Sequence, residues 1–456
     1  MNAIVQYLRS KGYNCVPDEF YSSVALWRKW YQGRVPEFHD YRQYNGKVRL
    51  RRSRRSLAMA KTVTEDWANL ALNEKVEIMC GKKSTDKRVW DVLDANKFRV
   101  RGNQLLEMAF AMGTGALVER KDADGAIKID YIRADMIYPL SWDNLTITQC
   151  AFASETASGK ERHVYLNLHL LENGKYVVEN HMFRRIGEAL TEIGLPPGVE
   201  TRSSTGSPTP LFQIIRPNIA NNLDPDCPMG ISVYANALPQ LEGLDLVYDS
   251  YCNEFQLGRK RITVPMSMAR VQMEQDGTVT PVFDDNDTEF FAVPAAEGQD
   301  NKIQEHNMEI RYQAHDAGIQ TALNLLSFKC GMGKDRYNFQ DGQVKTATEV
   351  VSEKSDLFQS LKKHELLLRD ALAGLFTAVA ALLGLEAPEV TVNFDDSIIE
   401  DSDTQRATDR QDVRDGLMAK WEYRRRWYGE DEKTARAMAA ELDAGPELRF
   451  GGDGRC

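Results

Sequence analysis

The side chains best suited to chemistry lie in a short polar segment, residues 331–345, where basic and acidic residues alternate between glycines. The charged residues of interest and one glycine beside them are Lys334, Asp335, Arg336, Asp341, Gly342 and Lys345. Interleaved charges give weak, screened contact with phosphate groups rather than a tight grip. The glycines give the backbone freedom to move. The pattern therefore favours a loop that moves against a polyanion, with an ordinary solvated connection as the alternative.

Two long helical patterns come before this loop and must position it. Apolar residues recur every three or four positions over residues 232–257 and again over residues 304–329. Pro239 should start or kink the first helix. An insert of about 45 residues with short strand patterns separates the two, far longer than ordinary helix–helix connections. We expect an antiparallel helix pair with the insert projecting at one end.

The helix pair carries more apolar surface than two helices can bury against each other. The large side chains in question are Tyr248, Tyr251, Phe255 and Leu323. We expect neighbouring subunits to cover the remainder, which predicts a cyclic, heterologous interface.

The strongest run of one charge covers residues 47–55, where Lys47 and five arginines alternate with Val48 and Leu50. Such a run can contact phosphates, or it can form an edge strand at a subunit interface or in solvent. The alternation favours the edge strand, and both interpretations stay open.

Signature motifs of catalysis are missing. Residues 81–84 lack the upstream glycine of a phosphate-binding loop, and neither GxSxG nor HExxH occurs. His163 and His169 share one face of a predicted strand, but no Cys or carboxylate spacing accompanies them. The acidic run 284–287 is more typical of a solvated turn than of a calcium loop. We predict no catalytic residue, no cofactor and no metal site.

Composition places the chain among folded proteins. It has 456 residues and a net charge of −10, which argues against a generally basic surface that coats nucleic acid. The seven cysteines are scattered and are expected to be reduced thiols. The longest uncharged apolar run, residues 371–385, is short for a membrane span of about 20 residues and predicts a buried helix.

The chain divides into an α+β first half and a mainly helical second half. Strand patterns flank Asp124-Gly125 and Asn173-Gly174, two hairpin signatures. A further strand is predicted at 390–394, and the charged tail from 404 to 442 should be helical.

Four segments, taken in order, resemble the portal proteins of tailed bacteriophages of Gram-positive hosts. They are residues 38–75, residues 228–255, residues 345–353 and residues 392–398. The resemblance covers roughly residues 20 to 430 and rests on the order and spacing of the segments, since none is a catalytic signature.

This resemblance implies a dodecameric ring at one capsid vertex that conducts double-stranded DNA and is not an enzyme. The implied regions are a wing (1–231), stem helices (232–257 and 304–330), a clip (258–303), a tunnel loop (331–345), a wing or tunnel helix (346–365) and a crown (366–456). Implied partners are the terminase large subunit, a head-completion or adaptor protein, and capsid and scaffolding proteins, with assembly in the host cytoplasm and no membrane.

Two other functions fit the residues alone. A nucleic-acid hydrolase would show metal-dependent turnover and clustered, perturbed acids. A non-viral ring-forming scaffold would form rings without a neighbouring terminase gene.

Overall fold

The computed structural model divides by its contacts into two compact units, residues 1–394 and 395–456. The residues that it describes are 3–44, 46–122, 124–159, 161–187, 189–266, 268, 270–273, 279–282, 290–293, 302–338, 347–386, 389–394 and 402–444.

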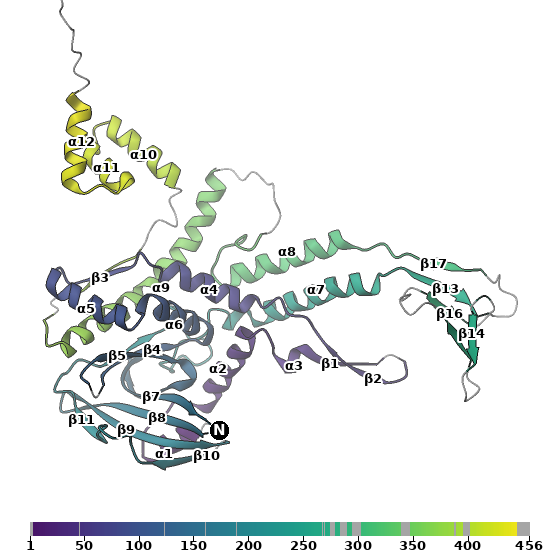
Figure 1. Cartoon of the computed structure of the whole chain (residues 1–456), viewed down its shortest axis with the longest axis horizontal. Coiled ribbons are helices and arrows are strands. Elements are labelled where there is room, and N and C mark those ends of the chain that lie inside the picture. Colours follow the sequence, from purple (N-terminus) through teal and green to yellow (C-terminus); the bar gives the residue numbers. More distant parts are fainter. Residues whose placement is uncertain are drawn as a thin grey trace, which may run out of the picture. The chain divides into compact units, whose positions relative to one another are not determined.

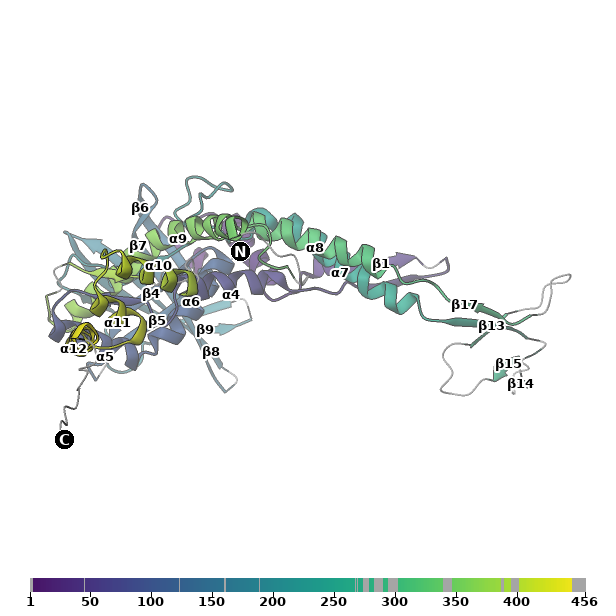
Figure 2. The ribbon, with the colours of Figure 1, turned by 90° about the horizontal axis from the view of Figure 1, so that it is seen from above.

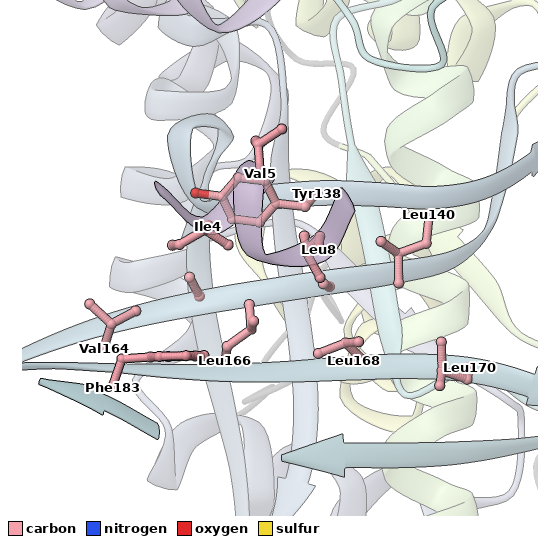
Figure 3. Close-up of a cluster of buried hydrophobic side chains, with 12 residues drawn as sticks. Ile4, Val5, Leu8, Tyr138, Leu140, Val164, Leu166, Leu168, Leu170 and Phe183 are labelled. Carbon is pink, nitrogen blue, oxygen red and sulfur yellow. The ribbon is translucent and has the colours of Figure 1, made fainter. Parts of the chain in front are cut away.

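The first unit contains an antiparallel sheet with the strand order β10-β9-β8-β7-β6, and β11 also pairs with β9. These strands are β6 (Ile137–Asp143), β7 (Thr146–Ser158), β8 (Glu161–Glu172), β9 (Lys175–Ile186), β10 (Ala189–Ile193) and β11 (Arg202–Ser204). Helix α1 (Ala3–Ser10) packs Ile4, Val5 and Leu8 against one face of this sheet (Figure 3). Alternate residues of β8, from Val164 to Leu170, point into this core because side chains alternate along a strand.

A second sheet, with the order β12-β4-β5, lies among helices. Its strands are β4 (Gly115–Lys121), β5 (Ile127–Arg133) and β12 (Phe212–Ile215). The helices around it are α2 (Asp18–Tyr31), α4 (Met59–Ala71), α5 (Lys83–Ala95), α6 (Phe98–Met112) and α9 (Ala347–Leu382). Trp27 and Trp67 are buried in this part, as expected of core residues. The apolar run from 371 is also buried, with Leu372 and Phe376 fully covered.

The helix pair consists of α7 (Leu238–Leu257) and α8 (Tyr312–Lys329), which lie side by side in both views (Figures 1 and 2). Pro239 occupies the first turn of α7, so the expected helix start at this proline is confirmed. Among its described residues, the insert between the helices holds five strands: β13 (Arg261–Pro265), β14 (Arg270–Met273), β15 (Val279–Val282), β16 (Phe290–Val293) and β17 (Gln304–His306). β13 pairs with β16 and β17, and β14 pairs with β15.

The predicted start of the second helix at residue 304 was wrong. Gln304–His306 pairs with Arg261–Thr263 as strand β17, and α8 begins only at Tyr312. A partner strand satisfies the backbone groups of this segment, which outweighs its helical periodicity. Ile310 lies before the helix, where a side-chain atom at Gly258 would come within 3.4 Å of it.

Both predicted hairpins are confirmed, as β4–β5 and as β8–β9. The sequence prediction missed the β6–β7 hairpin, whose turn residues Asn144 and Leu145 both have positive φ angles. A leucine in a left-handed turn gives no sequence signal, because glycine or asparagine normally fills that position.

The described residues of the first unit also form several smaller elements. They are α3 (Pro36–His39), β1 (Asp40–Tyr44), β2 (Arg49–Ser53), β3 (Glu77–Met79), β18 (Thr391–Asn393) and the 3₁₀ turns η1 (Ala134–Met136) and η2 (Ala235–Ala237). β18 confirms the strand expected near 390 and pairs with β3, more than 300 residues earlier in the sequence. Helix α9 runs unbroken through residue 366, where the resemblance implied the start of a crown, and the compact unit continues to Phe394.

The second unit is helical, as the tail pattern predicts: α10 (Ser402–Arg414), α11 (Lys420–Tyr428) and α12 (Glu432–Ala444). Trp427 donates its indole N–H to the buried carboxylate of Asp409, at 2.7 Å, which ties α11 to α10. In the described part of the chain, no helix combines the length and the apolar character needed to cross a bilayer.

Candidate functional site

The loop after α8 starts from a firmly held segment. The indole nitrogen of Trp67, in α4, donates a hydrogen bond to the carbonyl of Cys330 at 3.1 Å. Two residues later Met332 is buried, and its backbone N–H bonds to the carbonyl of Ser327 at 3.0 Å. The end of α8 and the first residues of the loop therefore form part of the core around α4.

Tyr337 and Arg336 fix the loop further along. Tyr337 is buried, and its backbone carbonyl accepts a hydrogen bond from the Gln320 side chain at 3.2 Å. Burial, followed by the nearby Asp66 carboxylate, raises the pKa of the Tyr337 hydroxyl well above its usual value. Nε of Arg336 lies 3.3 Å from the same Asp66 carboxylate. Asp66 thus partly neutralises one of the cations predicted for this loop.

The predicted loop residues fall into two groups. Lys334 is exposed, Asp335 is partly buried, and Arg336 is exposed but paired with Asp66. Asp341, Gly342 and Lys345 lie outside the described residues, so their placement remains a prediction.

The helix that follows the loop, α9, is also fixed to the body of the first unit. Its His364 ring lies 4.8 Å from the Trp67 ring, and Nδ1 of His364 accepts the backbone N–H of Asn218 at 3.0 Å. Burial, and to a lesser degree Lys363, lowers the pKa of His364 to about 4, so the ring stays neutral at neutral pH. Trp67 therefore contacts both the residue that ends α8 and the helix beyond the loop.

The two helices of the pair are joined by charge at the end nearest the insert. Arg311 donates to both carboxylate oxygens of Glu254, at 2.9 Å and 2.8 Å, and His315 lies 3.5 Å from the same group. The Arg311 guanidinium lowers the pKa of Glu254 to about 2. A planar, bidentate pair of this kind fixes the register between α7 and α8.

The four predicted interface residues on the helix pair differ in exposure. Leu323 is 1% exposed and packs inside the chain, so it leaves no surface for a neighbour. Tyr248 and Tyr251 are partly buried, and the Tyr251 ring contacts the His315 ring across the pair at 6.2 Å. Phe255 remains 43% exposed.

Sequence reasoning missed the more exposed apolar side chains of this pair. They are Leu246 and Leu257 on α7, and Tyr312, Leu325 and Phe328 on α8. Leu325 and Phe328 lie three residues apart on α8 and therefore on the same side of it. We call this pair the stem face. Apolar residues off the main periodic stripe, such as Leu325 beside the buried Leu326, are the signal that could have revealed them.

Two buried carboxylates on α7, also missed from the sequence, hold the base of the basic hairpin β1–β2. Asp245 lies 3.1 Å from Nε2 of His39 and accepts the backbone N–H of Leu57 at 2.8 Å. Asp249, one turn later, accepts the backbone N–H of Arg55 at 3.1 Å. Acids four residues apart on an otherwise apolar face were the available signal.

The two histidines considered as metal ligands do not lie in a ligand cluster. His163 lies 3.5 Å from Glu161, while burial lowers the pKa of His169 to about 3. Among the described residues, no group of three or more His, Cys, Asp or Glu side chains could hold one metal ion.

Comparison with known protein families gives a match over most of the chain. No curated protein shows significant similarity to the chain. A family model described as "Phage portal protein, SPP1 Gp6-like" matches residues 17–443 of the 456. The match spans both compact units, including the loop, the helix pair and the basic hairpin. The chain therefore belongs to the SPP1 Gp6-like family of phage portal proteins.

Proposed function

We propose that this protein is the head-to-tail connector of a phage. It forms a ring, dodecameric as in the portal family, at one vertex of the capsid. Double-stranded DNA passes through the ring during packaging and ejection without sequence-specific contacts. The ring associates with capsid and scaffolding proteins during assembly in the host cytoplasm.

The observation that carries this proposal is the stem face. Phe328, at 60% exposed, and Leu325 lie on the outside of a helix pair whose inner face is already filled by Leu323 and Leu326. Contiguous exposed apolar side chains favour burial against another surface, at about 25 cal/mol for each Å² covered. In a ring, each subunit covers this face with a different face of its neighbour, so the contact closes on itself.

The test is the mass distribution of the purified protein at micromolar concentration, with images of negatively stained particles. The wild type should form rings, and Phe328→Ser should shift the distribution to monomers. Val100→Ser, which removes an exposed apolar side chain from α6, serves as the matched control and should leave rings intact. Only monomers and dimers of the wild type at every salt concentration would contradict the proposal.

The insert between α7 and α8 is proposed to dock the terminase large subunit and later a head-completion protein. In the part of the insert that the structure describes, the sheets have three strands and two strands, which are too few for a stable independent domain. They should therefore pack between subunits into a collar. Replacing residues 266–290 with a short linker should spare the rings and abolish terminase binding; unchanged recovery of the terminase in pull-downs would contradict this assignment.

A further inference from the structure

The basic hairpin β1–β2 stands apart from every other sheet. In the described part of the chain, β1 pairs only with β2, and the ribbon extends in the same direction as α7 (Figures 1 and 2). Its base is fixed by the contacts of Asp245 and Asp249 and by Arg54, whose guanidinium covers the rings of Phe38 and Tyr41 at 4.8 Å and 4.5 Å. A two-stranded ribbon is marginally stable alone, so we expect another surface to cover the exposed body of this one.

The charges on the ribbon repel one another. The strand register places Arg42 opposite Arg51 and Tyr44 opposite Arg49, all on one face. Like charges directly opposite each other destabilise a strand pair. Arg51 reaches Asp40 at 3.4 Å, whereas Arg42 and Arg49 contact no carboxylate among the residues that the structure describes. The ribbon therefore favours a partner that brings negative charge.

The side chains between the arginines indicate that this partner is a protein. Tyr44 is 64% exposed and Val48 is 51% exposed. Phosphate groups gain nothing from these apolar surfaces, whereas tyrosine and arginine together are enriched at protein interfaces.

The remaining chain supplies the complementary charge. Residues 40–55 hold seven basic residues and one acid, a net charge of +6. Because the whole chain has a net charge of −10, the rest of the chain has a net charge of −16. We propose that the β1–β2 hairpin is a docking arm that binds an acidic surface on a second copy of this chain. This inference rests on the proposed ring, and it assigns the arm a contact separate from the stem face.

Cross-linking tests the contact directly. Two variants carry the photo-cross-linker benzoylphenylalanine, one in place of Tyr44 and the other in place of Val48. Each variant is assembled separately with isotope-labelled wild type and irradiated. Products that join an unlabelled arm peptide to a labelled peptide with acidic residues are expected. Rings without such products at either position, or cross-links only to added DNA, would overturn the docking arm.

Charge reversal tests its contribution. Arg42→Glu with Arg49→Glu should raise the subunit concentration at which half the protein is in rings by at least about tenfold. Lys87→Glu with Arg88→Glu, two exposed cations on α5, is the control and should leave it unchanged. If wild-type rings form and the arm variant assembles equally well, the docking-arm proposal is wrong and the proposed function is unaffected. If the wild type itself forms no rings, the proposed function is contradicted, and the docking arm, which rests on it, is contradicted with it.

Discussion

Gly113 and Gly230 meet backbone to backbone at the point where the end of α6 touches the segment that leads into α7. A Cβ atom on Gly113 would lie 2.3 Å from the carbonyl oxygen of Gly230, and one on Gly230 would lie 2.4 Å from the carbonyl oxygen of Gly113. Gly113 also has a φ of +86°, a conformation that other residues rarely adopt. Thr114 completes the contact by accepting the N–H of Gly230 at 3.0 Å.

This close approach predicts that Gly230→Ala destabilises the subunit by about 3 kcal/mol, the upper end of the usual range for overpacking, because backbone atoms on both sides would have to move apart. Urea denaturation of the purified chain measures the effect. Gly243→Ala is the matched control: it lies in α7, where the added methyl group would meet no atom within 4 Å beyond the local backbone of its own helix. The control should be neutral or slightly stabilising, and equal denaturation midpoints for the two variants would contradict the prediction.

The anchor of the basic hairpin gives a second prediction. Asp245→Ala removes the partner of His39 and of the Leu57 N–H in a buried site, so it should cost about 2–4 kcal/mol. Glu242→Ala, at an exposed position one turn earlier on the same helix, should change stability little. The difference between the two denaturation midpoints is the measurement, and a neutral Asp245→Ala would mean that the hairpin base does not depend on α7.

Local sequence patterns predicted many of the turns, helix starts and strands of the fold. Asn173-Gly174 marked the β8–β9 turn and Pro239 marked the start of α7, because each acts through its own backbone. The α+β class followed from such signals together with helical periodicity.

Long-range pairs account for what sequence reasoning missed. Arg336 and Asp66 are 270 residues apart, and His39 and Asp245 are 206 apart, so no spacing in the sequence connects them. Leu323 follows the helical period that was expected to provide interface residues, yet the fold buries it inside the chain. Burial within one chain and burial against a neighbour give the same apolar pattern.

A buried acid in β4 predicts a dependence on pH. Glu119 is fully covered, and neither carboxyl oxygen has a hydrogen-bond partner among the described residues. Burial raises the pKa of Glu119 well above its usual value of 4.5. The folded state therefore favours the protonated form, and its stability relative to the unfolded chain falls as the pH rises above 4.5 towards the raised pKa.

Glu119→Gln should remove this penalty. We expect the variant to be roughly 1–3 kcal/mol more stable than the wild type at pH 7, with the gain disappearing below about pH 4, where the acid is protonated in both states. Thermal melts between pH 4 and pH 8 measure the difference. An equal gain at both ends of this range would show that packing, not ionisation, is responsible, and Glu242→Gln controls for the loss of one surface charge.

The pairing of Asp66 with Arg336 leads to a prediction about DNA movement, which rests on the proposed function. Asp66→Asn keeps the shape of the side chain and leaves the Arg336 guanidinium without its counter-charge at 3.3 Å. The loop would then hold phosphates more tightly, and each contact must break at every step of the DNA. We expect normal rings and slower packaging at low salt, with the rate recovering as salt screens the added charge.

Glu65→Gln, on the same helix and paired with Lys61, is the control. The measurement is the packaging rate with the cognate terminase as a function of salt concentration, and a wild-type salt dependence for Asp66→Asn would contradict contact between this loop and DNA.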